Sequence, residues 1–233
     1  MIKPVLFNTE MVKSILEGRK IETRRIVKNV PVSTCGTYSF ETIEVDPDIT
    51  TTKRNLDYET LIGTYALFEH SDYEEFSTYI KSAYNVGDIL WVRETWKILN
   101  FLEKLSMQFE YAADGKISEI IDISSSRVEG LLKFFKKSGW IPSLFMPREA
   151  ARIFLKVTSV RVERLRDITD AGAKNEGTAY PQGLDNWVSA FIRLWNSTIK
   201  KTDIDINGWD ADPWVWVYEF ERCEKPAVDV SPI

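Results

Sequence analysis

The sequence is poor in the residues that most often build metal sites and catalytic triads. It has one histidine and two cysteines among 233 residues, and the cysteines, Cys35 and Cys223, lie far apart in no metal-binding or redox spacing. Zinc sites need several Cys and His ligands, and a serine-type triad needs a histidine. We therefore expect free thiols, no metal and no cofactor. If the protein is an enzyme, its base should be Lys, Asp or Glu.

The sequence also lacks long apolar runs and an excess of positive charge. No run reaches the ~18 residues of a membrane span, and Met1-Ile2-Lys3-Pro4 begins no secretory signal. We expect a cytoplasmic protein without a membrane partner. The formal net charge of -5 argues against a nonspecific nucleic-acid coat, which requires a basic surface. The hydrophobic content of 44% and charged content of 28% are ordinary for a soluble globular protein.

One short stretch departs from this acidic balance. Residues 18–28 contain five cations and one anion, Glu22, and five minus one leaves +4. The cations are Arg19, Lys20, Arg24, Arg25 and Lys28. The stretch follows a predicted amphipathic helix that Asn8 or Thr9 can cap and Gly18 can end, and a strand is predicted over residues 21–27. The charged residues can bind an anion or perform acyl transfer; the alternative is a solvated, positively charged loop.

Two regions have the pattern of insertions, residues 29–86 and 97–145. In the first, strands are predicted over residues 60–68 and 73–82, with His70 exposed in the turn between them. In the second, we expect a strand over residues 108–112, the turn Asp114-Gly115, and a helix from Val128 that ends at Gly139. The whole chain, residues 1–233, is predicted to be a single domain carrying these two insertions.

Charge also gathers at the ends of other predicted elements. The apolar strand 89–96 ends with Arg93 and Glu94, either a structural ion pair or a functional one. Arg148 and Arg152 follow Met146-Pro147 and would share a face of a helical turn, either extending the positive site or lying on plain surface.

The remaining predicted elements lie near the C-terminus. A helix capped by Thr169 is predicted to end with Glu176. A negative charge at a helix C-terminus interacts unfavourably with the helix dipole, so either Glu176 has another role or the helix end is frayed and exposed. A second helix can be capped by Asp185. The alternating aromatic run over residues 214–221 predicts a closing core strand.

Four of these segments together resemble an ASCH-domain protein of the PUA-like superfamily, of the type found in phages and prophages. They are Gly18-Arg19-Lys20-x-x-Thr23-x-Arg25, residues 87–96, the strand after Met146-Pro147-Arg148-Glu149, and residues 169–177 with the closing strand. They cover roughly half the chain. The resemblance implies an α+β fold: a small mixed or antiparallel PUA-like β-barrel with surrounding helices and a cleft that faces RNA, a nucleotide or a modified base.

The resemblance also implies chemistry at particular residues. In small bacterial members that hydrolyse N4-acetylcytidine, a lysine is the base, a threonine the nucleophile and a glutamate the proton donor, and these fall on Lys20, Thr23 and Glu176. The chain departs from that pattern in having Glu22 beside Thr23 and in its two insertions. Lys20 and Thr23 would point to opposite faces of an ideal strand, so the mechanism needs a turn or bulge between Gly18 and Thr23.

Three functions remain open at this point. The first is binding of RNA, single-stranded nucleic acid or a modified nucleoside or nucleotide through a local basic cleft; its candidate residues are Arg19, Arg24, Arg25, Arg93, Glu94, Trp96 and Arg148. The second is an amidohydrolase acting on N-acylated cytidine or a related nucleobase through Lys20, Thr23 and Glu176. The third is a phage accessory protein that binds a host protein through its insertions.

Overall fold

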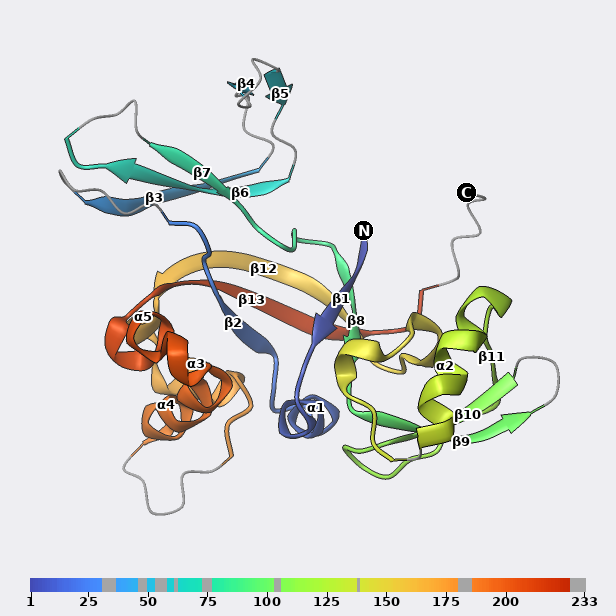
Figure 1. Ribbon diagram of the computed structural model, residues 1–233. Coiled ribbons are helices and arrows are strands. Elements are labelled where there is room, and N and C mark those ends of the chain that lie inside the picture. Colours follow the sequence, from blue (N-terminus) through green and yellow to red (C-terminus); the bar gives the residue numbers. More distant parts are fainter. Residues whose placement is uncertain are drawn as a thin grey trace. The chain divides into compact units, whose positions relative to one another are not determined.

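The computed structural model describes nine stretches of the chain (Figure 1). They are residues 1–30, 37–45, 50–52, 58–60, 63–72, 77–102, 106–137, 139–179 and 186–226. These residues form two compact units. Unit 1 contains Met1–Ile21, Asp88–Lys156 and the segment from Phe220, and unit 2 contains Glu22–Gly87 and Val157–Glu219. Each unit combines strands with helices.

The first sheet of unit 1 has the order β1-β8-β12. β1 (Ile2–Leu6) runs parallel to β8 (Ile89–Arg93), and β8 is antiparallel to the first residues of β12 (Phe154–Arg164). The chain's amino group and Lys3 both form ion pairs with Asp88, which joins the start of β1 to the turn before β8. α1 (Thr9–Leu16) follows β1, and the Asn8 side chain caps it by accepting from the Met11 amide.

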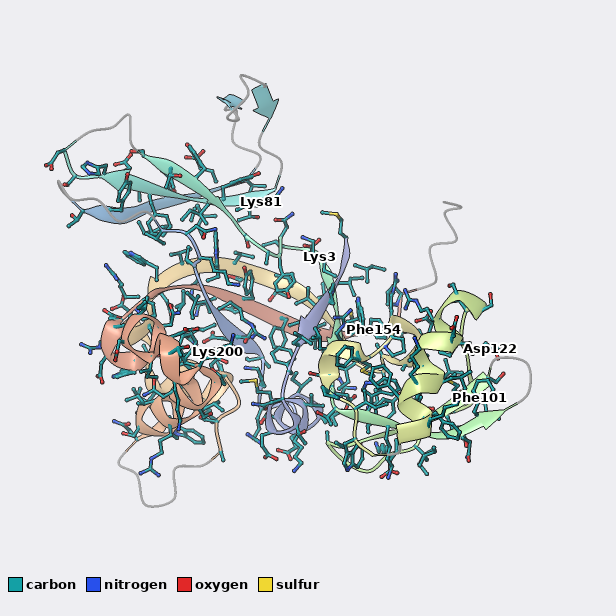
Figure 2. The ribbon with its side chains drawn as sticks, in the orientation of Figure 1. Lys3, Lys81, Phe101, Asp122, Phe154 and Lys200 are labelled. Carbon is teal, nitrogen blue, oxygen red and sulfur yellow. The ribbon has the colours of Figure 1, made fainter. Side chains whose placement is uncertain are left out.

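The second sheet of unit 1 has the order β11-β10-β9. It consists of β9 (Trp96–Leu102), β10 (Ser106–Tyr111) and the short β11 (Ile121–Asp122), all antiparallel. Figure 2 labels Phe101 and Asp122 at one end of it. α2 (Ser125–Lys137) packs on this sheet (Figure 1), and two 3-10 turns follow, η3 (Ser143–Phe145) and η4 (Arg148–Ala150). Alternate residues of β10 point inward, so Met107, Phe109 and Tyr111 are buried in one apolar core.

The central strands of unit 2 have the order β12-β13-β2. β13 (Trp214–Cys223) pairs antiparallel with β2 (Glu22–Ile26), which is the edge strand of that order. A three-stranded sheet follows β2 in the chain, with β3 (Tyr38–Val45), β6 (Thr64–His70) and β7 (Thr78–Lys81) in the order β3-β6-β7. β4 (Thr50–Thr52) and β5 (Tyr58–Thr60) form a separate pair.

The helices of unit 2 lie between β12 and β13 in the chain. They are η5 (Leu165–Asp167), α3 (Asp170–Asn175), α4 (Trp187–Thr198), η6 (Lys201–Asp203), α5 (Ile204–Asn207) and η7 (Trp209–Ala211). Buried residues of α3 and α4, Ala173 and Phe191, pack with Val215 and Val217 of β13. The other face of β13 carries Trp216 and Tyr218, which pack with β6 residues. β13 is therefore covered on both sides, as its aromatic and β-branched composition predicted.

Several sequence-based predictions are confirmed. The first helix, the strand after it, the helix with its Thr169 cap and the closing aromatic strand all form near the predicted residues. The turn at Asp114-Gly115 is also present, and Gly115 has a φ of 68°. These elements are defined by local patterns of apolar side chains and by capping residues, which explains why sequence alone locates them.

Other predictions are wrong. His70 is the last residue of β6 and is buried against the edge of Tyr38, so it is not an exposed turn residue. β3 forms within a stretch in which no periodic element was predicted. The α4 cap is Asn186, while Asp185 and Cys35 lie outside the described residues. Arg152 lies beyond η4, so it does not share a helical face with Arg148.

The protein is a mixed α+β structure dominated by strands. The strand orders found in the described stretches are open, and none closes into a barrel. The described helices include none with the length and apolar character required to cross a membrane.

Candidate active site

The cationic motif begins at a tight turn in unit 1. Gly18 follows α1 with a φ of 73°, a left-handed conformation that suits glycine. The amides of Arg19 and Lys20 both donate to the Ser14 carbonyl, at 2.9 and 3.0 Å. The chain therefore turns between the end of α1 and Lys20, and β2 begins at Glu22. Lys20 is only 2% exposed, and its Nζ lies 5.4 Å from the centre of the Phe7 ring.

The two faces of β2 have different chemistry in unit 2. Directly paired residues of antiparallel strands share a face, so Thr23 lies on the same face as Tyr218, and Arg25 on the same face as Trp216. The opposite face of β2 carries Glu22 and Arg24. Thr23 is thus beside aromatic side chains, while its two neighbours in the chain point into a cluster of charges.

Glu176 reaches β2 from the end of α3. Its Oε1 accepts a hydrogen bond from the Arg24 amide at 2.6 Å, and it lies 3.4 Å from Arg24 Nη1. Since Thr23 directly precedes Arg24, the carboxylate is placed next to the predicted nucleophile along the chain. Gly172 makes this approach possible, because a Cβ there would lie 3.0 Å from Arg24 Nη2 and 3.3 Å from Glu22 Oε1. Thr23 and Glu176 are 2% and 3% exposed.

A buried ion network holds this arrangement together. The Arg24 guanidinium pairs with Glu22, Glu163 and Glu176, and burial lowers its pKa less than these three carboxylates raise it, so the net shift is upward. Arg161 pairs with Glu22, Glu163 and Glu219; its pKa is also raised, since burial lowers it less than Glu22 and Glu163 together raise it. Four carboxylates and two guanidiniums leave a formal charge of -2. Arg24 is therefore not an unpaired cation.

Tyr218 is a site residue that sequence reasoning missed. Its hydroxyl lies 3.0 Å from the Ser82 hydroxyl, and its ring packs edge-on against Tyr84. Burial raises the pKa of Tyr218 to about 12, although Ser82, the Ala83 backbone and Arg25 act in the opposite direction. The sequence placed Tyr218 only as one ring in an aromatic core strand; the register with Thr23 comes from the pairing of β13 with β2.

Arg161 and Glu163 were missed as well. They alternate with the apolar Val160 and Val162 along β12, so a charged stripe on the second face of that strand was the available signal. The sequence could not show that this stripe meets Glu22 and Arg24.

The other candidate residues lie in unit 1 and have different partners. Glu94 does not pair with Arg93; it holds Arg152 in a two-pronged contact, with Nε–Oε1 and Nη2–Oε2 both 2.8 Å. Burial raises the pKa of Glu94 despite Arg152. Arg93 stacks on Trp91, 4.6 Å from the ring centre, and donates to the Leu144 carbonyl.

Trp96, Arg19 and Arg148 have mainly structural surroundings. Trp96 is fully buried in the core of the second sheet and contacts Phe109 edge-on. Arg19 forms an ion pair with Glu17 on the surface. Arg148 is half-buried in η4, and no ion pair is found for it in the described stretches.

The described residues contain no group of three or more His, Cys, Asp or Glu side chains able to hold a metal ion. Comparison of the whole chain with protein-family models, curated proteins and solved structures gave no significant match.

Proposed function

We propose that the protein is an ASCH-like amidohydrolase that binds an N-acylated nucleobase or nucleoside and removes the acyl group with Lys20, Thr23 and Glu176. The PUA-like fold is part of the same proposal. One observation carries it: Glu176 accepts a hydrogen bond from the amide next to Thr23 across 152 residues of sequence. Two residues that the resemblance pairs in one mechanism are thus neighbours in unit 2.

The three residues of the proposed mechanism are all buried. Lys20, Thr23 and Glu176 are each at most 3% exposed, so a reaction there would be shielded from bulk water. Lys20 precedes Thr23 by three residues, so the chain alone keeps their Cα atoms within roughly 11 Å.

The charge of the site favours a neutral ligand over a phosphate chain. The cluster beside Thr23 carries four carboxylates against two guanidiniums, and an excess of carboxylates repels phosphate groups. An N-acylated base is uncharged, so these carboxylates do not repel it. Arg24 is neutralised by its partners, so it does not serve as a phosphate-binding cation of a basic cleft.

The proposed reaction has two halves, acyl transfer to Thr23 and hydrolysis of the resulting ester. Thr23 Oγ1 attacks the acyl carbonyl carbon while Lys20 Nζ takes its proton. The carbon–nitrogen bond breaks, and the leaving amine receives through Glu176 the proton that Lys20 took from Thr23. Water then attacks the acyl ester; its oxygen bonds to the acyl carbon, the ester bond breaks, and a proton from the water returns to Thr23 Oγ1 through Lys20. In this structure Glu176 is a hydrogen-bond acceptor, so the proton it delivers must be one that it gains during the reaction.

The test compares two substitutions of Thr23. Thr23→Val keeps the shape and removes the hydroxyl, whereas Thr23→Ser keeps a hydroxyl. With N4-acetylcytidine as substrate, we expect turnover by the wild type, reduced turnover by Thr23→Ser, and a loss of at least about 100-fold in Thr23→Val. Equal turnover in Thr23→Val and the wild type would refute the mechanism. Absence of turnover in all three would refute the catalytic proposal.

Binding of single-stranded RNA is the second candidate. The observation in its favour is in unit 1, where no ion-pair partner of Arg93 or Arg148 is found in the described part of the chain. If these residues bind phosphates, affinity for a short RNA should fall steeply with salt concentration, and each Arg→Gln substitution should reduce the salt slope by about one. Binding that is indifferent to salt would exclude this role.

A further inference from the structure

An open sheet edge lies in the second insertion, far in sequence from the residues of the proposed active site. Residues 116–122 run along β10, with Ile117 opposite Glu110 and Ile121 opposite Met107. This strip is the outer member of the three-stranded sheet, since the strand order ends at β11. β11 lies beside η4, whereas residues 116–120 precede β11.

The hydrogen bonds of the strip show which backbone groups face outward. The Tyr111 amide donates to the Lys116 carbonyl at 3.0 Å, and the Ser118 amide donates to the Phe109 carbonyl at 2.8 Å. Because these groups alternate along an extended strand, the N–H and C=O of Ile117 point away from β10. No hydrogen bond of these two groups is found in the described stretches. The N–H and C=O of Ile117 can therefore form two hydrogen bonds with the backbone of an added strand.

A groove runs beside this edge. Its volume is about 530 Å³, and its lining consists of residues 116–121, Glu149, Ala151, Arg152, Tyr111 and Lys225. Volumes of roughly 300–1,000 Å³ are typical of ligand sites. Arg152 is fixed within it, since Glu94 and Asp114 hold its guanidinium and the Tyr111 ring lies 4.0 Å below it. The groove therefore has one rigid side.

The side chains along the groove are apolar and cationic. Ile117 and Ile120 are 58% and 59% exposed. Lys116 and Lys225 are exposed as well, and no ion pair is found for either among the described residues. Of the acids in the lining, Glu149 is paired with Arg127, which leaves Glu119. An occupant with apolar side chains and a carboxylate matches this surface.

We propose that this edge binds an extended, acidic peptide segment of a protein partner by strand addition. The backbone of the segment exchanges two hydrogen bonds with Ile117, its apolar side chains contact Ile117 and Ile120, and a carboxylate pairs with Lys116 or Lys225. Main-chain bonds supply affinity and alternate side chains supply specificity in this mode of recognition. The proposal is independent of the proposed hydrolase, because it uses none of its residues.

A substitution of the outward amide tests the main-chain bond directly. Ile117→Pro removes an N–H that makes no hydrogen bond within the sheet. Proline is tolerated at such positions of edge strands, where the N–H points away from the sheet. Ile117→Ala is the matched control. The probe is a displayed library of random nonapeptides selected on the full-length protein. We expect enriched peptides with alternating apolar residues and at least one acid, with synthetic copies binding Ile117→Pro about three- to tenfold more weakly than Ile117→Ala.

A second measurement covers the case in which Ile117→Pro does not fold. Methylation of alternate backbone nitrogens in the selected peptide removes its strand hydrogen bonds without changing its side chains, and binding to the wild type should fall by a similar factor. Lys116→Gln and Lys225→Gln together should weaken acidic peptides more than their amide analogues. No enrichment, or enriched peptides that bind the proline variant and the methylated form equally well, would overturn the proposal.

Discussion

The strongest test of the ion network in unit 2 is replacement of Arg24 by leucine. The Arg24 side chain is 2% exposed and contacts three carboxylates, those of Glu22, Glu163 and Glu176. Leucine fills part of the space but pairs with none of them. Glu22 and Glu163 also pair with Arg161, and the Glu176 carboxylate also accepts from the amide of residue 24. The substitution thus removes one cation from a buried cluster of carboxylates.

The expected decrease in the free energy of unfolding follows from the burial of the carboxylates that pair with Arg24. Removing one member of a buried ion pair typically lowers the free energy of unfolding by about 3–5 kcal/mol, because the remaining charge stays desolvated. We expect Arg24→Leu to lie in that range. In a double variant, Glu176→Gln should recover about 1–2 kcal/mol, since it removes the negative charge of one carboxylate that has lost its ion pair with residue 24.

Arg161→Leu is the matched control. Arg161 contacts two of the same carboxylates, but its side chain is 36% exposed, so water screens its charges and the loss should be less than half as large. Urea unfolding at neutral pH, followed by tryptophan fluorescence and circular dichroism, measures both variants. A loss below about 1 kcal/mol for Arg24→Leu, or a larger loss for Arg161→Leu, would refute the reasoning.

Three further predictions concern other parts of the fold. Folding raises the pKa of Tyr218 from its ordinary value near 10 to about 12, so the unfolded chain loses this proton at a lower pH than the folded protein, and the free energy of unfolding should fall by up to about 3 kcal/mol between pH 10 and 12. Tyr218→Phe should remove that fall. Alkaline urea titrations that show the same fall in both proteins would contradict the prediction. Arg152→Lys should lower the free energy of unfolding by about 1–3 kcal/mol, since lysine cannot make the two-pronged contact with Glu94; an unchanged melting temperature would show that the contact is dispensable. Gly115→Ala should destabilise the folded protein by about 1–2 kcal/mol, because Gly115 has a left-handed φ of 68°. Gly130→Ala within α2 should stabilise it by about 0.5–1 kcal/mol, because alanine favours the helix more than glycine does. Calorimetry of the two variants should therefore show melting temperatures shifted in opposite directions.

Local signals were enough to predict much of the secondary structure. The cap at Asn8, the apolar stripe of α1 and the stop at Gly18 are all read from neighbouring residues, and each contributes within one or two helical turns. The same is true of Thr169 and α3, and of β13, whose alternating aromatic side chains can only be accommodated in a strand with two apolar faces.

The predictions that failed depended on contacts between distant segments. His70 is polar and follows an apolar run, so sequence suggests a turn, but pairing of β6 with β3 places it against Tyr38. Glu94 follows Arg93 directly, yet its partner is Arg152, because adjacent residues of a strand point to opposite faces. Sequence spacing cannot specify such partners.

The sequence by itself located α1, β2, α3 and β13, and showed which residues carry unusual charge. Only the tertiary structure decided that Arg24 is neutralised by three glutamates, that Glu176 bonds beside Thr23, and that Tyr218 shares a face with Thr23. The physical reason is that the two kinds of interaction act over different distances along the chain. Helix caps and alternating side chains act over a few residues, whereas the charge state and neighbours of a buried group depend on whichever distant strand or helix packs against it.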